Sequence, residues 1–184
     1  MGDRVELELR LPRHHDIFGV RSVRLELRVP RDLRSDIRTA DGSISVQSLR
    51  GETRLSTGDG HIEADSLDGT LDASTGDGHI RVQGRFDGLA LHTGDGSVEA
   101  DVRSGSRMAS DWTVRTSDGR VTLSLPAEFS ADVDLRTADG RIDSTLPLNV
   151  AGGHDKHELH GRLNAGGRLL TVRTSDGSIH LQRR

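Results

Sequence analysis

The sequence predicts an all-β fold and, within that class, a single-domain parallel β-solenoid (β-helix) with coils of about 18 residues. Three observations predict it: a tetrapeptide recurs at a fixed step, apolar residues alternate with polar ones between its copies, and helical periodicity is absent. Only 32% of the 184 residues are hydrophobic and 2% are aromatic, while 22 are glycine. This composition excludes a core built on large side chains and suits thin coils filled by small aliphatic residues.

The recurring tetrapeptide is Thr-x-Asp-Gly, and its first three steps are 18 residues each. A second turn signal lies half a period away, at 48–51 and 66–69 and in weaker form at 85–88. Each coil therefore has two turns. The seven copies begin at Thr39, Thr57, Thr75, Thr93, Thr116, Thr137 and Thr174.

Two short strands are expected in each coil, because apolar and polar residues alternate on both sides of the motif. Thr116 shares its face with Val114, so the motif hydroxyl is expected to point inward or to lie at a corner. The constant step favours parallel coils over an antiparallel meander, with residues 18 apart stacked at about 4.8 Å. The column Glu63, Arg81 and Glu99 would then alternate in charge. The handedness of the coil stays open.

Domain organisation follows the repeat. Residues 1–36 are expected to form the first strands and to cap the stack, and residues 37–184 to form the solenoid, as one continuous domain. The alternating segment 5–13 recurs 18 residues later as 23–31, which predicts one strand in each copy. Roughly eight or nine coils would give a rod near 40 Å long.

Extra length is found at two places in the repeat. The step from Thr93 to Thr116 is 23 residues, and the step from Thr137 to Thr174 is 37, which is one coil plus an insertion. With coils stacked in chain order, residues 182–184 would end the stack, and their charges would blunt the open strand edge.

The Asp-Gly pair of each motif is predicted to be a turn, in which Asp caps the loop through its own backbone and Gly accepts a positive φ. The alternative is a file of stacked carboxylates that binds calcium or another cation. Only one half of each coil carries the Asp, whereas calcium-binding β-rolls carry it in both halves. The turn residues are Asp41, Gly42, Asp59, Gly60, Asp77, Gly78, Asp95, Gly96, Asp118, Gly119, Asp139, Gly140, Asp176 and Gly177.

Histidines are the other residues with metal-binding chemistry. His61 and His79 occupy one slot in adjacent coils, next to Asp59 and Asp77, and are weak candidates for a metal pair. Other coils place Ser or Arg in that slot, which indicates an exposed position of no special role. His154, His157 and His160 lie in a glycine-flanked stretch that predicts a solvated hairpin or loop. No metal and no cofactor are expected.

Several classes of function are excluded or disfavoured. No cysteine is present for thiol chemistry. A net charge of -4 without a basic stripe or stacking aromatics argues against nucleic acid. No run approaches the roughly 18 apolar residues that span a bilayer. No catalytic constellation stands out, and the chain is not expected to be an enzyme.

The Thr-x-Asp-Gly turns, with the ending 160–167 followed by 170–179, resemble the bacterial candidate adhesins of the DUF4097 family over roughly residues 20–184. This resemblance implies a β-helix domain that is exported to the periplasm or cell surface, and no catalytic residue to transfer. No signal peptide or anchor is visible in this chain. The expected function is a non-catalytic, envelope-associated rigid module for a protein or glycan partner.

Three alternatives stay open. A polymerising scaffold similar to bactofilins would stack coil ends into filaments, because solenoid ends expose strand edges. A calcium-dependent binding module would use the Asp file. A polysaccharide-active enzyme would use paired carboxylates. In solution the chain is expected to be a monomer or to associate weakly end to end.

Overall fold

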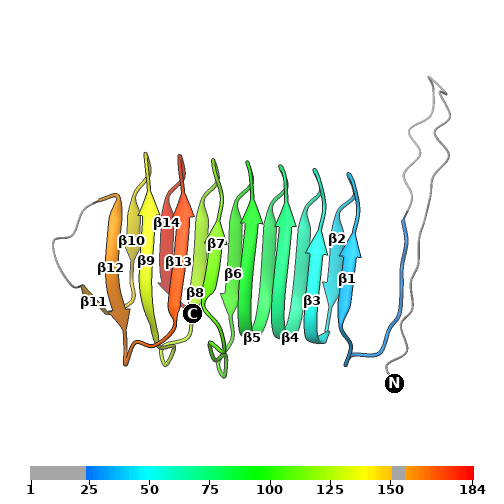
Figure 1. The fold of residues 1–184 in the computed structure, drawn as a ribbon, viewed down its shortest axis with the longest axis horizontal. Helices are drawn as coiled ribbons and strands as arrows, with labels where there is room; N and C mark the ends of the chain where they lie inside the picture. The colour runs from blue at the N-terminus through cyan, green and yellow to red at the C-terminus, as the bar shows by residue number, and fades with distance from the viewer. Residues whose placement is uncertain (1–23, 151–155) are drawn as a thin grey trace.

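The structure is a computed structural model that describes residues 24–150 and 156–184. Within these residues it is all β, with fourteen strands in one sheet and no helix, which confirms the predicted all-β class (Figure 1). The described residues therefore contain no helix that is long and apolar enough to cross a membrane. The strands are β1 (Ser35–Arg38), β2 (Ile44–Gln47), β3 (Arg50–Ser56), β4 (Ile62–Thr75), β5 (Ile80–Thr93), β6 (Val98–Val102), β7 (Trp112–Arg115), β8 (Val121–Leu125), β9 (Ala131–Thr137), β10 (Ile142–Ser144), β11 (Leu148–Val150), β12 (Glu158–Leu163), β13 (Leu169–Thr174) and β14 (Ile179–Arg183).

Parallel pairing at an 18-residue offset organises the N-terminal half. Strand β2 pairs with β4, β3 with β4, and β4 with β5, all parallel. Ile62 lies beside Ile80, and Leu71 beside Leu89. Residues of the same kind are therefore neighbours from coil to coil, and the buried positions of one coil continue those of the next.

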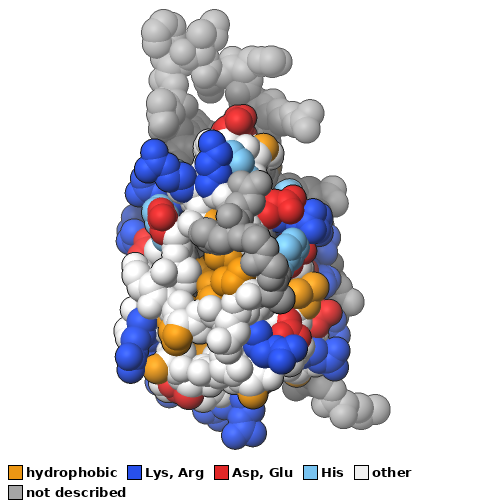
Figure 2. All heavy atoms as spheres, turned by 90° about the vertical axis from the view of Figure 1, so that its left-hand side faces the viewer, with side chains coloured by type: hydrophobic (Ala, Val, Ile, Leu, Met, Phe, Trp, Pro, Cys, Tyr) orange, Lys and Arg blue, Asp and Glu red, His pale blue; other side chains and the backbone are white. Residues whose placement is uncertain are grey.

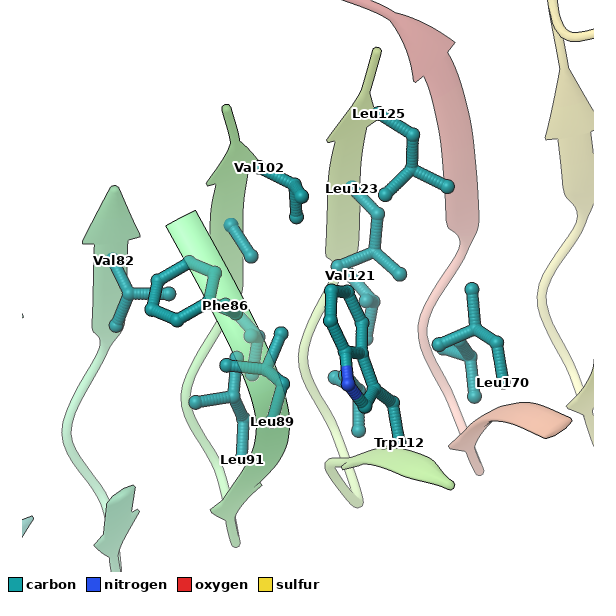
Figure 3. Close-up of a cluster of buried hydrophobic side chains, with 14 of the residues drawn as sticks. Val82, Phe86, Leu89, Leu91, Val102, Trp112, Val121, Leu123, Leu125 and Leu170 are labelled. Carbon is teal, nitrogen blue, oxygen red and sulfur yellow. The ribbon is translucent and has the colours of Figure 1, made fainter. Parts of the chain in front are cut away.

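The core runs along the inside of the stack and is filled mostly by Leu, Ile, Val and Ala. Among the described residues, three buried aromatic rings lie together. Phe86 meets Trp112 edge to face at 6.4 Å between ring centroids, and Trp112 lies 5.0 Å from Phe129. Figure 3 shows Phe86 and Trp112 among Leu91, Leu123 and other aliphatic side chains. Aromatic packing therefore serves one region of a mainly aliphatic core.

The order of the last coils differs from the order of the chain. Strand β13 lies between β7 and β9, and β14 lies between β8 and β10 (Figure 1). Val172 is thus the neighbour of both Val114 and Leu135. The expectation that coils stack in chain order, with residues 182–184 at the end, is wrong. The long step before Thr174 carries the chain back past β9 and β10, so that the last coil inserts between two earlier ones.

An antiparallel hairpin of β11 and β12 covers the edge of β9 at the end of the stack formed by β9 and β10, while β10 is paired, among the described strands, only with β14. Strand β12 runs antiparallel to β9, with Leu159 opposite Leu135, and β11 pairs with β12. Leu159 and Leu163 are buried by this packing. Figure 2 faces this end, where hydrophobic side chains gather at the centre and charged and His side chains surround them. The sequence around His154, His157 and His160 predicted a hairpin or loop, and at this end of the stack an antiparallel hairpin replaces the parallel pairing.

The strand expected over 23–31 does not form. Residues 24–30 have no regular structure, and Leu25, Leu27 and Val29 are 55%, 60% and 49% exposed. A step of 18 residues would place Glu26 over the buried Ile44, and charged side chains would then enter the core. The first copy at 5–13 lies outside the described residues, and the capping role of residues 1–36 stays a prediction.

Candidate functional site

The motif threonines form a ladder along one edge of the stack. The Oγ1 atom of Thr75 accepts a hydrogen bond from the Gly78 N–H at 3.3 Å and donates one to the Gly60 carbonyl of the preceding coil at 2.8 Å. The hydroxyl therefore closes its own turn and links it to the next turn. The same pair of bonds is made by Thr57, Thr93, Thr116, Thr137 and Thr174, all buried.

The motif aspartates lie outside this ladder. All seven are exposed, and within the described ranges their carboxylates make no hydrogen bond or ion pair. The turn is thus capped by Thr and not by Asp as expected, because the buried hydroxyl reaches two coils at once. The carboxylates are left facing solvent as one column.

Six of the seven motif glycines, all but Gly42, are required by close approach to the backbone of the neighbouring coil and not by the expected positive φ. A Cβ atom on Gly78 would lie 1.9 Å from the Gly60 carbonyl oxygen, and Gly96 and Gly119 are equally tight. Positive φ occurs in the half-period turns instead, at Ser66 (φ 56°) among others. Glycine therefore sets how closely neighbouring coils stack.

The slot of His61 and His79 forms a second ladder. Their rings stack 5.1 Å apart at an angle of 9°. Nδ1 of His61 accepts from the His79 N–H, and Nδ1 of His79 from the Ser97 N–H, both at 3.0 Å. Ser43 Oγ accepts from the His61 N–H in the same way. The sequence predicted no special role for this position, but its side chains accept hydrogen bonds from the backbone of the following coil.

Metal binding at the candidate residues finds no support in this geometry. A metal at either Nδ1 would displace a backbone hydrogen bond. Asp59 and Asp77 are exposed, and within 24–150 and 156–184 no group of three or more His, Asp or Glu side chains is placed to hold a metal ion. In the hairpin, His160 lies on β12 with Nδ1 3.5 Å from Asp134 Oδ1, while His154 lies outside the described residues.

Outward columns elsewhere on the rod alternate in charge, as the sequence predicted for one of them. Arg81 forms an ion pair with Glu99, with 2.8 Å between Nη2 and Oε2. Arg54 and Asp72 pair at 3.1 Å between Nε and Oδ2. Each exposed pair contributes at most about 1 kcal/mol, but a column of them favours the native register.

One column breaks this rule, and sequence reasoning missed it. His92, Arg115, Arg173 and Arg136 lie side by side on β5, β7, β13 and β9, and together they are called the arginine row. They line a shallow depression of about 440 Å³ with hydroxyl residues that include Ser117. A signal was present: an Arg stands directly before the Thr in four of the seven motif copies, at Arg38, Arg115, Arg136 and Arg173, and the stack brings the last three side by side. Their unequal spacing in the chain hid the column.

Acidic neighbours balance only part of the arginine row. Asp134 lies 3.0 Å from Arg136 and 3.9 Å from Arg173, measured between side-chain N and O atoms. The hydrogen bond to Asp134 and its charge, and then the charge of Glu158, raise the pKa of Arg136. Arg115 makes no ion pair with any residue that the structure describes.

The fold and this surface define an all-β, solenoid-like protein whose polar side chains are organised in columns. Residues 32–182 match the family model described as Toastrack DUF4097, and the chain belongs to this family. A solved structure from Clostridium sporogenes ATCC 15579, titled as a candidate cell adhesion protein, is similar at 14% identity with a TM-score of 0.33. The match covers 70% of this chain and 56% of that one, so this chain spans little more than half its length. No curated protein is a significant match.

Proposed function

We propose that this chain is a non-catalytic, rigid binding module of the cell envelope, built as a parallel β-solenoid of 18-residue coils, with a protein or glycan as its partner. The observation that carries the proposal is the threonine ladder. It ties each turn to the next through buried hydrogen bonds, so that side-chain columns hold fixed positions about 4.8 Å apart. A surface of this kind suits recognition of an extended partner.

Membership of the Toastrack DUF4097 family supports the envelope location, since the resemblance to that family implies exported β-helix domains. The non-catalytic role is supported by the use of the polar groups. Threonine hydroxyls and imidazole Nδ1 atoms bind backbone, and many carboxylates pair with arginines of adjacent coils. Groups held in this way stabilise a scaffold and are not available as nucleophile or base.

The structure supports a function as a polymerising scaffold less than a function as a discrete module. Filaments would need open strand edges at both ends of the stack. At the end of the stack formed by β9 and β10, the hairpin of β11 and β12 covers the edge of β9 with antiparallel strands and buries Leu159 and Leu163. The cation-dependent module stays a prediction that rests on the exposed Asp column.

Retention on envelope material tests the proposal. The purified protein is passed over immobilised cell-envelope polysaccharides and washed envelope fractions, and each eluate is assayed for new reducing ends. We expect retention without cleavage, and a monomer of 20.0 kDa by light scattering. Cleavage that a single carboxylate substitution abolishes in a folded variant would overturn the non-catalytic role. Rods that lengthen with protein concentration would favour the polymerising scaffold.

A further inference from the structure

The arginine row is the feature of this surface that the rod itself does not need. Arg115 lies beside Arg173, and Arg173 beside Arg136, each in register on neighbouring parallel strands. The side chains of Arg173 and Arg136 are 50% and 44% exposed, so their guanidinium groups reach solvent. Three cations therefore follow one another along the rod at the strand spacing of about 4.8 Å.

Like charges on adjacent strands destabilise a sheet, and elsewhere on this rod acidic residues separate the arginines. Here Asp134 serves both Arg136 and Arg173, and Glu158 lies 3.7 Å from Arg136. Arg115 is left without an acidic partner among the described residues. On a chain with a net charge of -4, this is a local excess of positive charge that a bound anion would neutralise.

We infer that the arginine row binds an anionic polysaccharide through the carboxylates of consecutive uronic acid residues, an inference that rests on the proposed binding function. Guanidinium groups bind carboxylates through two parallel charge-assisted hydrogen bonds. Ser117 and Ser175 line the same depression, and their hydroxyls can donate to and accept from sugar hydroxyls.

The spacing of the cations disfavours an extended acidic peptide as the occupant. In an extended peptide the side chains on one face are about 6.7 Å apart, so its carboxylates fall out of step with cations about 4.8 Å apart. Single-stranded nucleic acid is recognised by stacking on exposed aromatic rings. The Phe and Trp rings of the described ranges, those of Phe86, Trp112 and Phe129, are all buried.

Titration with trigalacturonate at low salt, followed by calorimetry and by amide chemical shifts, tests this inference. We expect binding that weakens as salt rises, with shifts on β7, β13 and β9. Arg115→Gln and Arg173→Gln should each weaken binding about tenfold, because each loses charge-assisted hydrogen bonds. Arg81→Gln is the matched control, since Arg81 is paired with Glu99 elsewhere on the rod, and it should bind as the wild type does.

Circular dichroism of each variant separates lost binding from lost fold, and Arg115→Gln should keep its melting temperature because a like charge is removed. The inference fails if trigalacturonate does not bind, if both arginine variants bind normally, or if a poly-glutamate peptide or polyphosphate binds equally well. If the inference fails but the Arg115→Gln variant is still retained on envelope material, the proposed binding function stands. If the wild-type protein neither binds trigalacturonate nor is retained on any envelope material, both the inference and the proposed function are wrong.

Discussion

Replacing Thr75 by valine tests the threonine ladder, because valine keeps the shape of the side chain and removes only its hydroxyl. The variant leaves the Gly78 N–H and the Gly60 carbonyl without their partner, and both glycines are buried. An unsatisfied buried polar group costs about 1–3 kcal/mol, and valine recovers part of this by not burying a hydroxyl. The expected loss in the free energy of unfolding is therefore about 2–4 kcal/mol.

Urea denaturation followed by circular dichroism measures this loss, as a midpoint lowered by about 1 M or more. Thr75→Ser keeps the hydroxyl and loses one methyl group, so it should cost only about 1 kcal/mol. Thr39→Val is the second control. Thr39 is exposed, and within the described ranges its hydroxyl bonds only the Gly42 N–H, at 3.3 Å, so this variant should cost less than about 1 kcal/mol.

The reasoning is refuted if Thr75→Val unfolds within about 0.5 kcal/mol of the wild type, which is the range of ordinary surface substitutions. It is refuted equally if Thr75→Ser is as unstable as Thr75→Val, because the methyl group would then carry the effect. A cost for Thr39→Val that equals the cost for Thr75→Val would show that the link between coils adds nothing.

Two further changes address the stacking and the order of the coils. Gly78→Ala places a Cβ atom 1.9 Å from the Gly60 carbonyl oxygen and should lower the free energy of unfolding by about 3 kcal/mol or more. At Gly161 the nearest atom to an added Cβ is 3.3 Å away, so Gly161→Ala should be tolerated. Equal melting temperatures for the two variants would contradict this. Ending the chain at residue 168 removes β13 and β14 from between other strands, so hydrogen exchange should show loss of protection in β9 and β10 as well; protected β9 and β10 amides would mean that the coils stack in chain order.

Coil length and the inward positions could be predicted from the sequence, because both are local. A residue such as Ile62 is inward through the alternation of its own strand, and its neighbour Ile80 follows from the constant step. The turn residues could be located for the same reason. The atom that caps each turn could not be predicted, because Asp and Thr side chains both accept backbone hydrogen bonds. The second partner of the Thr75 hydroxyl, the Gly60 carbonyl, belongs to another coil.

The arginine row depended on the fold in another way. Arg115, Arg136 and Arg173 are 21 and 37 residues apart in the chain, and only the stack brings them side by side. The failed strand over 23–31 has a related cause. Its alternation suits a strand, but in an 18-residue register it is one residue out of phase with β2, and a one-residue shift reverses inside and outside.

By itself, the sequence determined a β-rich chain with an 18-residue repeat, with threonine inward or at a corner and the Asp-Gly pair in the turn, because each follows from side-chain alternation and turn chemistry. Only the tertiary structure decided which coil lies beside which. The apolar positions at Val114, Leu135 and Val172 are nearly interchangeable, so the pairing of β7 with β9 or with β13 satisfies the same pattern. The choice between them depends on packing, which has no local signature in the chain, and on the path of the long segment before Thr174, whose length is visible in the sequence but whose path is not.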